Sequence, residues 1–268
     1  MKQRLLVAAI GVPLLILVLV FLPPLATGIL VAAIAGAAAY ELLHTACKRP
    51  NELYGLTILY AALTALMVFS ITAVKSLAID WPQILYPAAA FLYLMGLFFF
   101  AVRTHGTEHA IPFTDVAVCI VAAFLFPAMY GCIALLRSIG PAFVLMPFVV
   151  AFIGDSFSML GGMAFGHKKF APNVSPNKTW AGFIAGPIGS ALGMVLLCLV
   201  CKWVWSMELP IWYFALVGVV ANLFGQLGDL STSLIKREAG IKDYSHIFLT
   251  HGGVLDRFDS IQIGRAHV

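Results

Sequence analysis

Acidic side chains inside apolar stretches are the first candidates for chemistry in this sequence of 268 residues, because burying a carboxylate is costly. Asp229 lies in the apolar run 209–235. If this run is a helix that extends past its apolar part, one helical face carries Gln226, Asp229, Ser233, Lys236 and Arg237. A carboxylate, a hydroxyl and two cations in a row could hold a metal ion and phosphate oxygens together. A polar stripe that faces another polar stripe explains the spacing equally well, as do cations that reach an interface.

A glycine pair followed by two aspartates forms a second candidate. Gly252 and Gly253 allow a backbone that a phosphate can approach closely. Asp256 and Asp259 are three residues apart, so on a helix they point to similar sides. Oxygen ligands of this kind suit Mg²⁺, which also binds substrate phosphates. His251 could act as a base or as a donor to phosphate, although a lone histidine is more often structural.

The segment 166–180 contains cations, hydroxyls and turn formers but no acid. That composition suits an anionic ligand, such as a nucleotide phosphate or a lipid headgroup. A basic loop without any site is the alternative. The sequence has no Walker A pattern and no G-x-G-x-x-G, so a nucleotide would be bound by another device.

Three further acids lie in or beside apolar runs. Asp155 lies deep in the run 139–160 and is a candidate site. Glu41 closes another run and could simply reach the interface. Asp115 begins a run, where a helix N-terminus favours negative charge, so a structural role is favoured there.

The elements that position these residues follow from composition. Of all residues 62% are hydrophobic and only 10% are charged, with a formal net charge of +4. This excludes a soluble globular domain, a disordered chain and a nucleic-acid binder with a dense basic face. The prediction is an all-α, polytopic integral membrane protein. Its eight spans are expected at about 5–22, 26–43, 53–74, 84–102, 113–135, 139–160, 181–203 and 209–235.

Basic residues set the orientation of these spans. With the N-terminus in the cytoplasm, 13 of the 16 Lys and Arg residues lie on the cytoplasmic side. The remaining three are Lys75, Arg137 and Lys202. The long polar segments 161–180 and 236–253 then face the cytoplasm, where a water-soluble substrate would be met.

Cysteines and small residues are interpreted as packing. Cys198 and Cys201 have a C-x-x-C spacing, but they lie within a continuous apolar stretch, which favours buried thiols over a redox or metal pair. The pairs Gly182 with Gly186 and Gly189 with Gly193 have the spacing that lets helix backbones approach closely.

The pattern from about residue 155 to 260 resembles a known family. It reads Ser233-x-x-Lys236-Arg237, Lys242-Asp243, His251-Gly252-Gly253 and Asp256-Arg257-x-Asp259. It is similar to the motif S-x-x-K-R-x4-K-D followed by H-G-G-x-x-D-R-x-D of the phosphatidate cytidylyltransferase (CDP-diacylglycerol synthase) family. The upstream segments 228–230 and 174–180 agree with that family, whereas the N-terminal half matches only as a set of spans.

The resemblance implies transfer of CMP from CTP to phosphatidic acid in phospholipid biosynthesis, giving CDP-diacylglycerol and pyrophosphate, with Mg²⁺ or a similar divalent cation. It implies a bacterial inner membrane, CTP, phosphatidic acid and membrane lipid as partners, and no nucleic acid; a homodimer stays open. The implied metal ligands are Asp229, Asp256, Asp259 and Asp155. The implied catalytic residues are Asp229, Lys236, Arg237, Lys242, Asp256 and Arg257. The implied substrate-binding residues are Ser175, Asn177, Lys178, Thr179, Ser233, His251, Gly252 and Gly253.

Two alternatives remain open. A CTP-dependent polyprenol kinase would also bind a nucleotide and a lipid, but would release CDP rather than pyrophosphate. An ion-coupled transporter would use Asp155 and Asp229 as intramembrane ion ligands. The absence of a convincing internal repeat disfavours the transporter.

The sequence departs from the family pattern in three places. Leu249-Thr250 stands where the family usually has Pro-Gly, and Ala181 stands where many members carry Glu or Gln. Residues 263–268 correspond to a translation of common sequencing-adapter DNA. We therefore expect one membrane-embedded domain over 1–262, a non-native tail over 263–268, and a ninth span missing from the C-terminus.

Overall fold

The computed structural model describes residues 13–47, 53–73, 81–245 and 253–255, with the side chains of 67–73 and 81–84 left out. They belong to two compact units. The N-terminal unit comprises residues 9–143, and the described part of the C-terminal unit begins at Val144. The predicted all-α class is confirmed, with one two-stranded sheet added to the helices. The prediction of a single domain over 1–262 stays a prediction.

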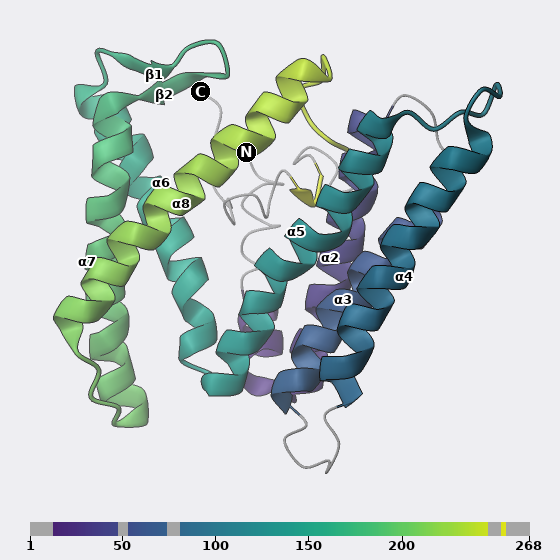
Figure 1. Cartoon of the computed structure of the whole chain (residues 1–268). Coiled ribbons are helices and arrows are strands. Elements are labelled where there is room, and N and C mark those ends of the chain that lie inside the picture. The colour runs from purple at the N-terminus through teal and green to yellow at the C-terminus, as the bar shows by residue number, and fades with distance from the viewer. Residues whose placement is uncertain (1–12, 48–52, 74–80, 246–252, 256–268) are drawn as a thin grey trace. The chain divides into compact units, whose positions relative to one another are not determined.

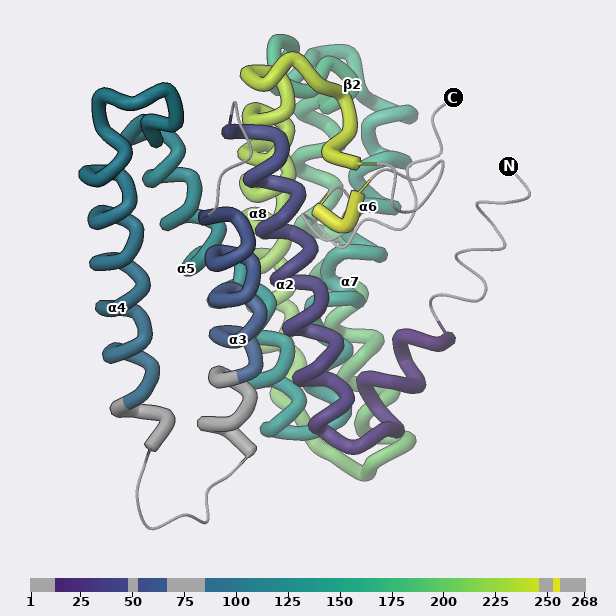
Figure 2. Tube along the Cα trace, turned by 90° about the vertical axis from the view of Figure 1, so that its right-hand side faces the viewer, coloured from purple at the N-terminus to yellow at the C-terminus, as the bar shows by residue number. Residues whose placement is uncertain are grey.

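The helices follow the apolar runs closely (Figures 1 and 2). The N-terminal unit contains the π-helix η1 (Leu17–Phe21), α2 (Pro24–Ala46), α3 (Leu53–Ala73), α4 (Trp81–Thr104) and α5 (Phe113–Ile139). The 3-10 turn η2 (Phe143–Leu145) leads into the C-terminal unit, which contains α6 (Met146–Phe165), β1 (Lys169–Ala171), β2 (Ser175–Thr179), α7 (Trp180–Trp205) and α8 (Ile211–Glu238).

Among the described residues, six helices are long and apolar enough to cross a membrane. They correspond to six of the eight predicted spans, and the polytopic membrane class is thereby supported. Of the first predicted span, the structure describes the part from Pro13 onward. Helix α3 occupies the third predicted span. The sixth span differs most from its prediction, because α6 begins only at Met146. Pro147 lies in the first turn of α6, where its missing N–H leaves no helical hydrogen bond unmade.

Small residues and hydrogen bonds between helices hold the N-terminal unit together. Ala35, Ala38 and Ala61 are fully buried, and α2 packs on both α3 and α5. The hydroxyls of Thr57 on α3 and Tyr93 on α4 lie 2.9 Å apart, and Tyr93 donates to the carbonyl of Cys119 on α5 at 3.3 Å. These hydrogen bonds tie three helices together inside an apolar environment, where they have little competition from water.

Two acids of this unit, Asp115 and Glu41, were expected to have structural roles at the ends of apolar runs. Asp115 lies in the first turn of α5, as expected for a charge at a helix N-terminus. Glu41, which could have reached the interface from the end of its run, is buried within the protein, with only 1% exposed. It lies on the face of α2 that also buries Ala38 and Leu42, so its position on the helix, not its nearness to the end, decides its burial.

All five cysteines are free thiols, and all except Cys132 are buried. The interpretation of Cys198 and Cys201 as packing residues therefore agrees with the structure. Cys47 directly follows α2, and burial raises the pKa of its thiol to about 11. It is thus protonated at neutral pH and is not a reactive thiolate.

In the C-terminal unit, glycines allow α6 and α7 to pack closely. A methyl group added at Gly182 would lie 2.6 Å from the carbonyl oxygen of Ser158. One added at Gly189 would lie 2.4 Å from Cβ of Phe157. The prediction that these small residues serve packing is confirmed. Helix α8 crosses α7 obliquely (Figure 1), and a methyl group added at Gly218 would lie 2.7 Å from the carbonyl oxygen of Ser190.

Candidate functional site

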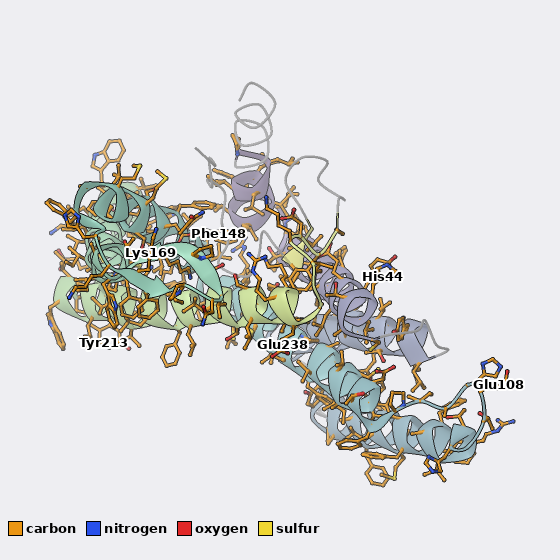
Figure 3. All side chains as sticks on the ribbon, turned by 90° about the horizontal axis from the view of Figure 1, so that it is seen from above. His44, Glu108, Phe148, Lys169, Tyr213 and Glu238 are labelled. Carbon is orange, nitrogen blue, oxygen red and sulfur yellow. The ribbon has the colours of Figure 1, made fainter. Side chains whose placement is uncertain are left out.

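The polar segment between α6 and α7 forms a β-hairpin. Strands β1 and β2 are antiparallel, with Lys169 opposite Thr179 and Ala171 opposite Ser175. The backbone N–H of Trp180 donates to the carbonyl of Lys168 at 3.0 Å and closes the base of the hairpin. The predicted loop thus contains regular secondary structure. Lys169 marks the hairpin in Figure 3.

Aromatic stacking and a helix cap fix the hairpin to α7. The ring of Phe170 stacks on Phe183 with centroids 4.4 Å apart, and meets the ring of Trp180 edge-on at 4.7 Å. The hydroxyl of Thr179 accepts a hydrogen bond from the backbone N–H of Gly182 at 3.2 Å, which makes Thr179 the N-cap of α7. Lys178, the residue before this cap, is therefore held in a defined direction.

Lys178 forms an ion pair with Asp229 of α8. Its Nζ also lies 3.4 Å from the backbone carbonyl oxygen of Gln226, to which it donates. The side chain of Asp229 is 3% exposed and that of Lys178 is 18% exposed, so most of this pair is withdrawn from water. A buried carboxylate beside an ammonium is stabilised in its charged form. Two segments predicted to carry separate polar groups thus meet at one point.

The predicted polar stripe of α8 is a single buried face. Helix α8 runs between the ends marked by Tyr213 and Glu238 in Figure 3. Its buried residues are Phe214, Gly218, Asn222, Gln226, Asp229 and Ser233, at spacings of three and four. Asp229 lies about 14 Å along the axis from the last residue of α8. Asp229 therefore lies well inside the helix and not at its C-terminal end.

One turn deeper, the stripe meets polar partners on the other helices. Nε2 of Gln226 donates to the carbonyl of Phe183 on α7 at 3.2 Å and to Oδ1 of Asn222 at 2.7 Å. Asn222 was not among the predicted site residues, although it lies four residues before Gln226 on the same face. This deeper part matches the alternative interpretation of the stripe, in which polar groups face one another.

Gly186 lies where polar atoms of all three helices converge. A methyl group at this position would lie 2.3 Å from Oγ of Ser158 on α6. It would also lie 2.8 Å from both Oδ1 of Asn222 and Nε2 of Gln226 on α8. Nearby, Oγ of Ser190 donates to the carbonyl of Val150 at 2.9 Å. These serines carried no signal in the sequence beyond being polar residues in apolar runs.

The C-terminal end of α8 also contacts the hairpin. Nε of Arg237 donates to the carbonyl of Val174, in the turn of the hairpin, at 3.3 Å. Gly240 adopts a positive φ of 70°, and the N–H of Ile241 returns to the carbonyl of Lys236 at 2.9 Å, which ends the helix.

The chain then folds back on α8. Tyr244 donates to the carbonyl of Thr232 at 2.9 Å, and Nζ of Lys236 lies 5.4 Å from the centre of the Tyr244 ring. The ammonium of Lys236 thus makes a cation–π contact with the Tyr244 ring, which holds it beside the buried face of α8.

The other predicted site residues divide into three groups. Ser175, Thr179, Ser233 and Gly253 are buried, and Asp155 is partly buried on α6. Asn177 and Lys242 are exposed. Five predicted residues lie outside the described residues, namely His251, Gly252, Asp256, Arg257 and Asp259.

The donor chemistry at Asp229 fits a divalent cation that prefers oxygen. The carboxylate is buried, and its oxygen already binds one positive charge, the ammonium of Lys178. Within the described ranges, no group of three or more His, Cys, Asp or Glu residues forms a complete ligand set. Asp256 and Asp259, the other acids predicted to contribute, fall outside those ranges.

Comparison with known proteins gives a family match over nearly the whole chain. The model of the cytidylyltransferase family matches residues 2–266. A protein of Staphylococcus epidermidis named phosphatidate cytidylyltransferase is 35% identical over 154 residues, which cover 58% of this chain and 58% of that protein. A protein of the same name from Rickettsia prowazekii is 38% identical over 124 residues, covering 44% of this chain and 53% of that protein. The chain thus spans little more than half the length of the curated relatives it matches.

Proposed function

The chain belongs to the cytidylyltransferase family, and on that premise we propose that it transfers CMP from CTP to phosphatidic acid. The products are CDP-diacylglycerol and pyrophosphate. Relatives named phosphatidate cytidylyltransferase support the choice of acceptor. A polytopic helical protein supports it as well, because a diacyl substrate stays in the bilayer while the nucleotide comes from water.

The buried ion pair of Lys178 and Asp229 is the observation that carries this proposal. It brings the basic hairpin and the polar face of α8 to one point, although the two residues are far apart in the sequence. The reaction joins two anions, so its main barrier is the crowding of negative charge. A site that places fixed cations beside a carboxylate able to recruit another cation meets that requirement.

Cationic side chains of the C-terminal unit neutralise the reactants. The phosphatidate oxygen attacks the α-phosphorus of CTP, and the bond to the β-phosphate breaks to release pyrophosphate. Lys178, Lys236 and Arg237 bind the phosphate oxygens as negative charge accumulates. The nucleophile is already an anion, so a strong general base is not obligatory. Lys242 and Arg257 of the motif are proposed to add to this charge.

A divalent cation such as Mg²⁺ is proposed at Asp229, with Asp256, Asp259 and Asp155 as further oxygen ligands. When bound, it neutralises phosphate charge and polarises the reacting phosphoryl group. Asp229 serves as its buried anchor. Ser175, Asn177, Ser233, His251, Gly252 and Gly253 are proposed to bind the nucleotide or the headgroup.

The proposed location is a bacterial inner membrane, with the N-terminus and the hairpin in the cytoplasm. The distribution of basic residues supports this orientation. In this orientation CTP reaches the hairpin from the cytoplasm, and the lipid enters from the inner leaflet.

The test is turnover by the purified chain in detergent micelles. Labelled CTP is supplied with phosphatidic acid, with and without Mg²⁺, and both pyrophosphate and the labelled lipid are measured. The proposal expects equal amounts of pyrophosphate and CDP-diacylglycerol, only when Mg²⁺ is present. Release of CDP with phosphorylation of a polyprenol would show the kinase instead. After reconstitution into sealed lipid vesicles, ion flux without nucleotide consumption would show the transporter.

A further inference from the structure

The ion pair joins Lys178 and Asp229, although each of these side chains binds a different ligand in the proposed function. In that function, on which this inference rests, Lys178 binds a phosphate oxygen and Asp229 binds a divalent cation. In the structure, the two groups bind each other. An ammonium and a divalent cation on one carboxylate repel each other at a separation of a few ångströms, and burial leaves little water to screen them. The two arrangements therefore exclude one another.

The surroundings of Lys178 allow its ammonium to leave without movement of the hairpin. The backbone beside it is fixed by the Thr179 cap, and the hairpin turn is fixed by Arg237. The side chain, in contrast, is a flexible four-carbon stem that carries a compact charge. At 18% exposure it is more accessible than Asp229, so it can turn toward a ligand on the water-facing side.

We propose that Lys178 is a tethered cation that occupies Asp229 in the ligand-free protein and competes there with the divalent cation. Nucleotide phosphate draws the ammonium away, so nucleotide and divalent cation bind cooperatively. By thermodynamic linkage, each ligand raises the affinity for the other by the same factor. The competition also keeps the buried carboxylate neutralised when no substrate is bound.

The experiment measures Mn²⁺ binding to the purified full chain without nucleotide, from the electron paramagnetic resonance signal of free Mn²⁺. Lys178→Gln is expected to bind Mn²⁺ about tenfold more tightly, within the usual range of coupling between ligands. Lys178→Arg keeps the charge and should bind as the wild type does. Lys202→Gln is the matched control, because Lys202 also pairs with a carboxylate, Glu208, but at an exposed position. Equal or weaker binding by Lys178→Gln overturns the proposal.

A second measurement guards against a loss of folding in Lys178→Gln. Thermal unfolding is followed with and without Mn²⁺, and the added Mn²⁺ should raise the melting temperature of this variant more than that of the wild type. An equal or smaller rise overturns the competition. After subtraction of the Mn²⁺ that a non-hydrolysable CTP analogue binds without protein, the analogue should increase Mn²⁺ affinity in the wild type, with little further increase in Lys178→Gln.

Wild-type turnover, measured in parallel, separates the two proposals. If the wild type makes CDP-diacylglycerol but Lys178→Gln gains no Mn²⁺ affinity, the competition is wrong and the proposed function stands. If the variant gains affinity but the wild type converts no CTP, the competition stands and the proposed function is wrong.

Discussion

At the scale of the residue, Asp229 differs from Asp115, another acid of the apolar runs. Asp115 lies in the first turn of its helix, where the backbone itself favours negative charge. Asp229 lies well inside α8, and its charge is compensated by Lys178 from a distant segment. A carboxylate retained there at the cost of its desolvation marks a site more strongly than one at a helix terminus.

Replacement of Asp229 by Asn tests this residue directly. The amide keeps the size of the side chain but removes the charge that anchors a cation. Turnover of CTP with phosphatidic acid should fall at least about a hundredfold, the usual scale for loss of one electrostatic group. Steady-state assays of pyrophosphate release measure the effect.

Glu208→Gln provides the matched control, because Glu208 also pairs with a lysine but its side chain is 81% exposed. This variant should keep wild-type turnover. Helical content by circular dichroism establishes that Asp229→Asn has folded. Folded Asp229→Asn protein with wild-type turnover would refute the role of this carboxylate.

At the scale of the element, the hairpin is the part that orients the site. It is held by backbone pairing, by the Phe170 stack on α7 and by the bond from Arg237. Thr179 belongs to the hairpin and also caps α7, so the strand passes directly into the helix. The hydroxyl predicted to bind substrate therefore has a structural task as well.

Thr179→Val removes the capping hydroxyl and keeps the shape of the side chain. The variant should lose about 1 kcal/mol of stability, because the N–H of Gly182 loses its acceptor. Thermal or detergent-induced unfolding measures this change, and Thr179→Ser should restore most of it. An unchanged stability together with a raised KM for CTP would show instead that the hydroxyl serves the ligand alone.

Gly186→Ala tests the close packing of α6, α7 and α8. The added methyl group would meet polar atoms of Ser158, Asn222 and Gln226, so we expect a loss of about 1–3 kcal/mol. Gly225→Ala on α8 is the control, since a methyl group there meets nothing within 4 Å. The control should be neutral or gain up to about 1 kcal/mol from helix propensity. Equal stability of the two variants would contradict the packing argument.

At the scale of the whole molecule, the chain is a set of apolar helices whose polar contacts concentrate in a few places. In the C-terminal unit, these contacts extend from Gly186, where α6, α7 and α8 meet, to the end of α8. The described residues of both units expose many large apolar side chains, among them Phe91, Phe224 and Leu227. An aqueous protein would not leave so many uncovered, whereas a bilayer accepts them.

Cysteine labelling tests the orientation of this molecule in the membrane. In a variant without its five native cysteines, Lys168→Cys reports on the hairpin and Lys202→Cys on the far end of α7. On intact spheroplasts, a membrane-impermeant maleimide should label the cysteine at 202 but not the one at 168. Permeabilised membranes should label both. The reverse pattern would place the hairpin outside the cytoplasm.

The sequence by itself determined the membrane class, most helix positions and the polar face of α8, because these depend on hydrophobic content and on local periodicity. Run length predicts a span, and offsets of three and four predict a shared face. It also indicated the family, through fixed residues from Ser233 to Asp259. Residues 251, 252, 256, 257 and 259 lie outside the described ranges, so their predicted roles stay predictions.

The tertiary structure alone decided which side chains meet. Lys178 and Asp229 belong to elements separated by the whole of α7, and no local pattern pairs them. Their meeting depends on how closely glycines let α7 pack against its neighbours and on how Phe170 and Arg237 fix the hairpin. Within the N-terminal unit, packing of α2 likewise buries Glu41, which its place near a helix end did not indicate. Such contacts arise from three-dimensional packing, whereas sequence periodicity records only which face of one element is polar.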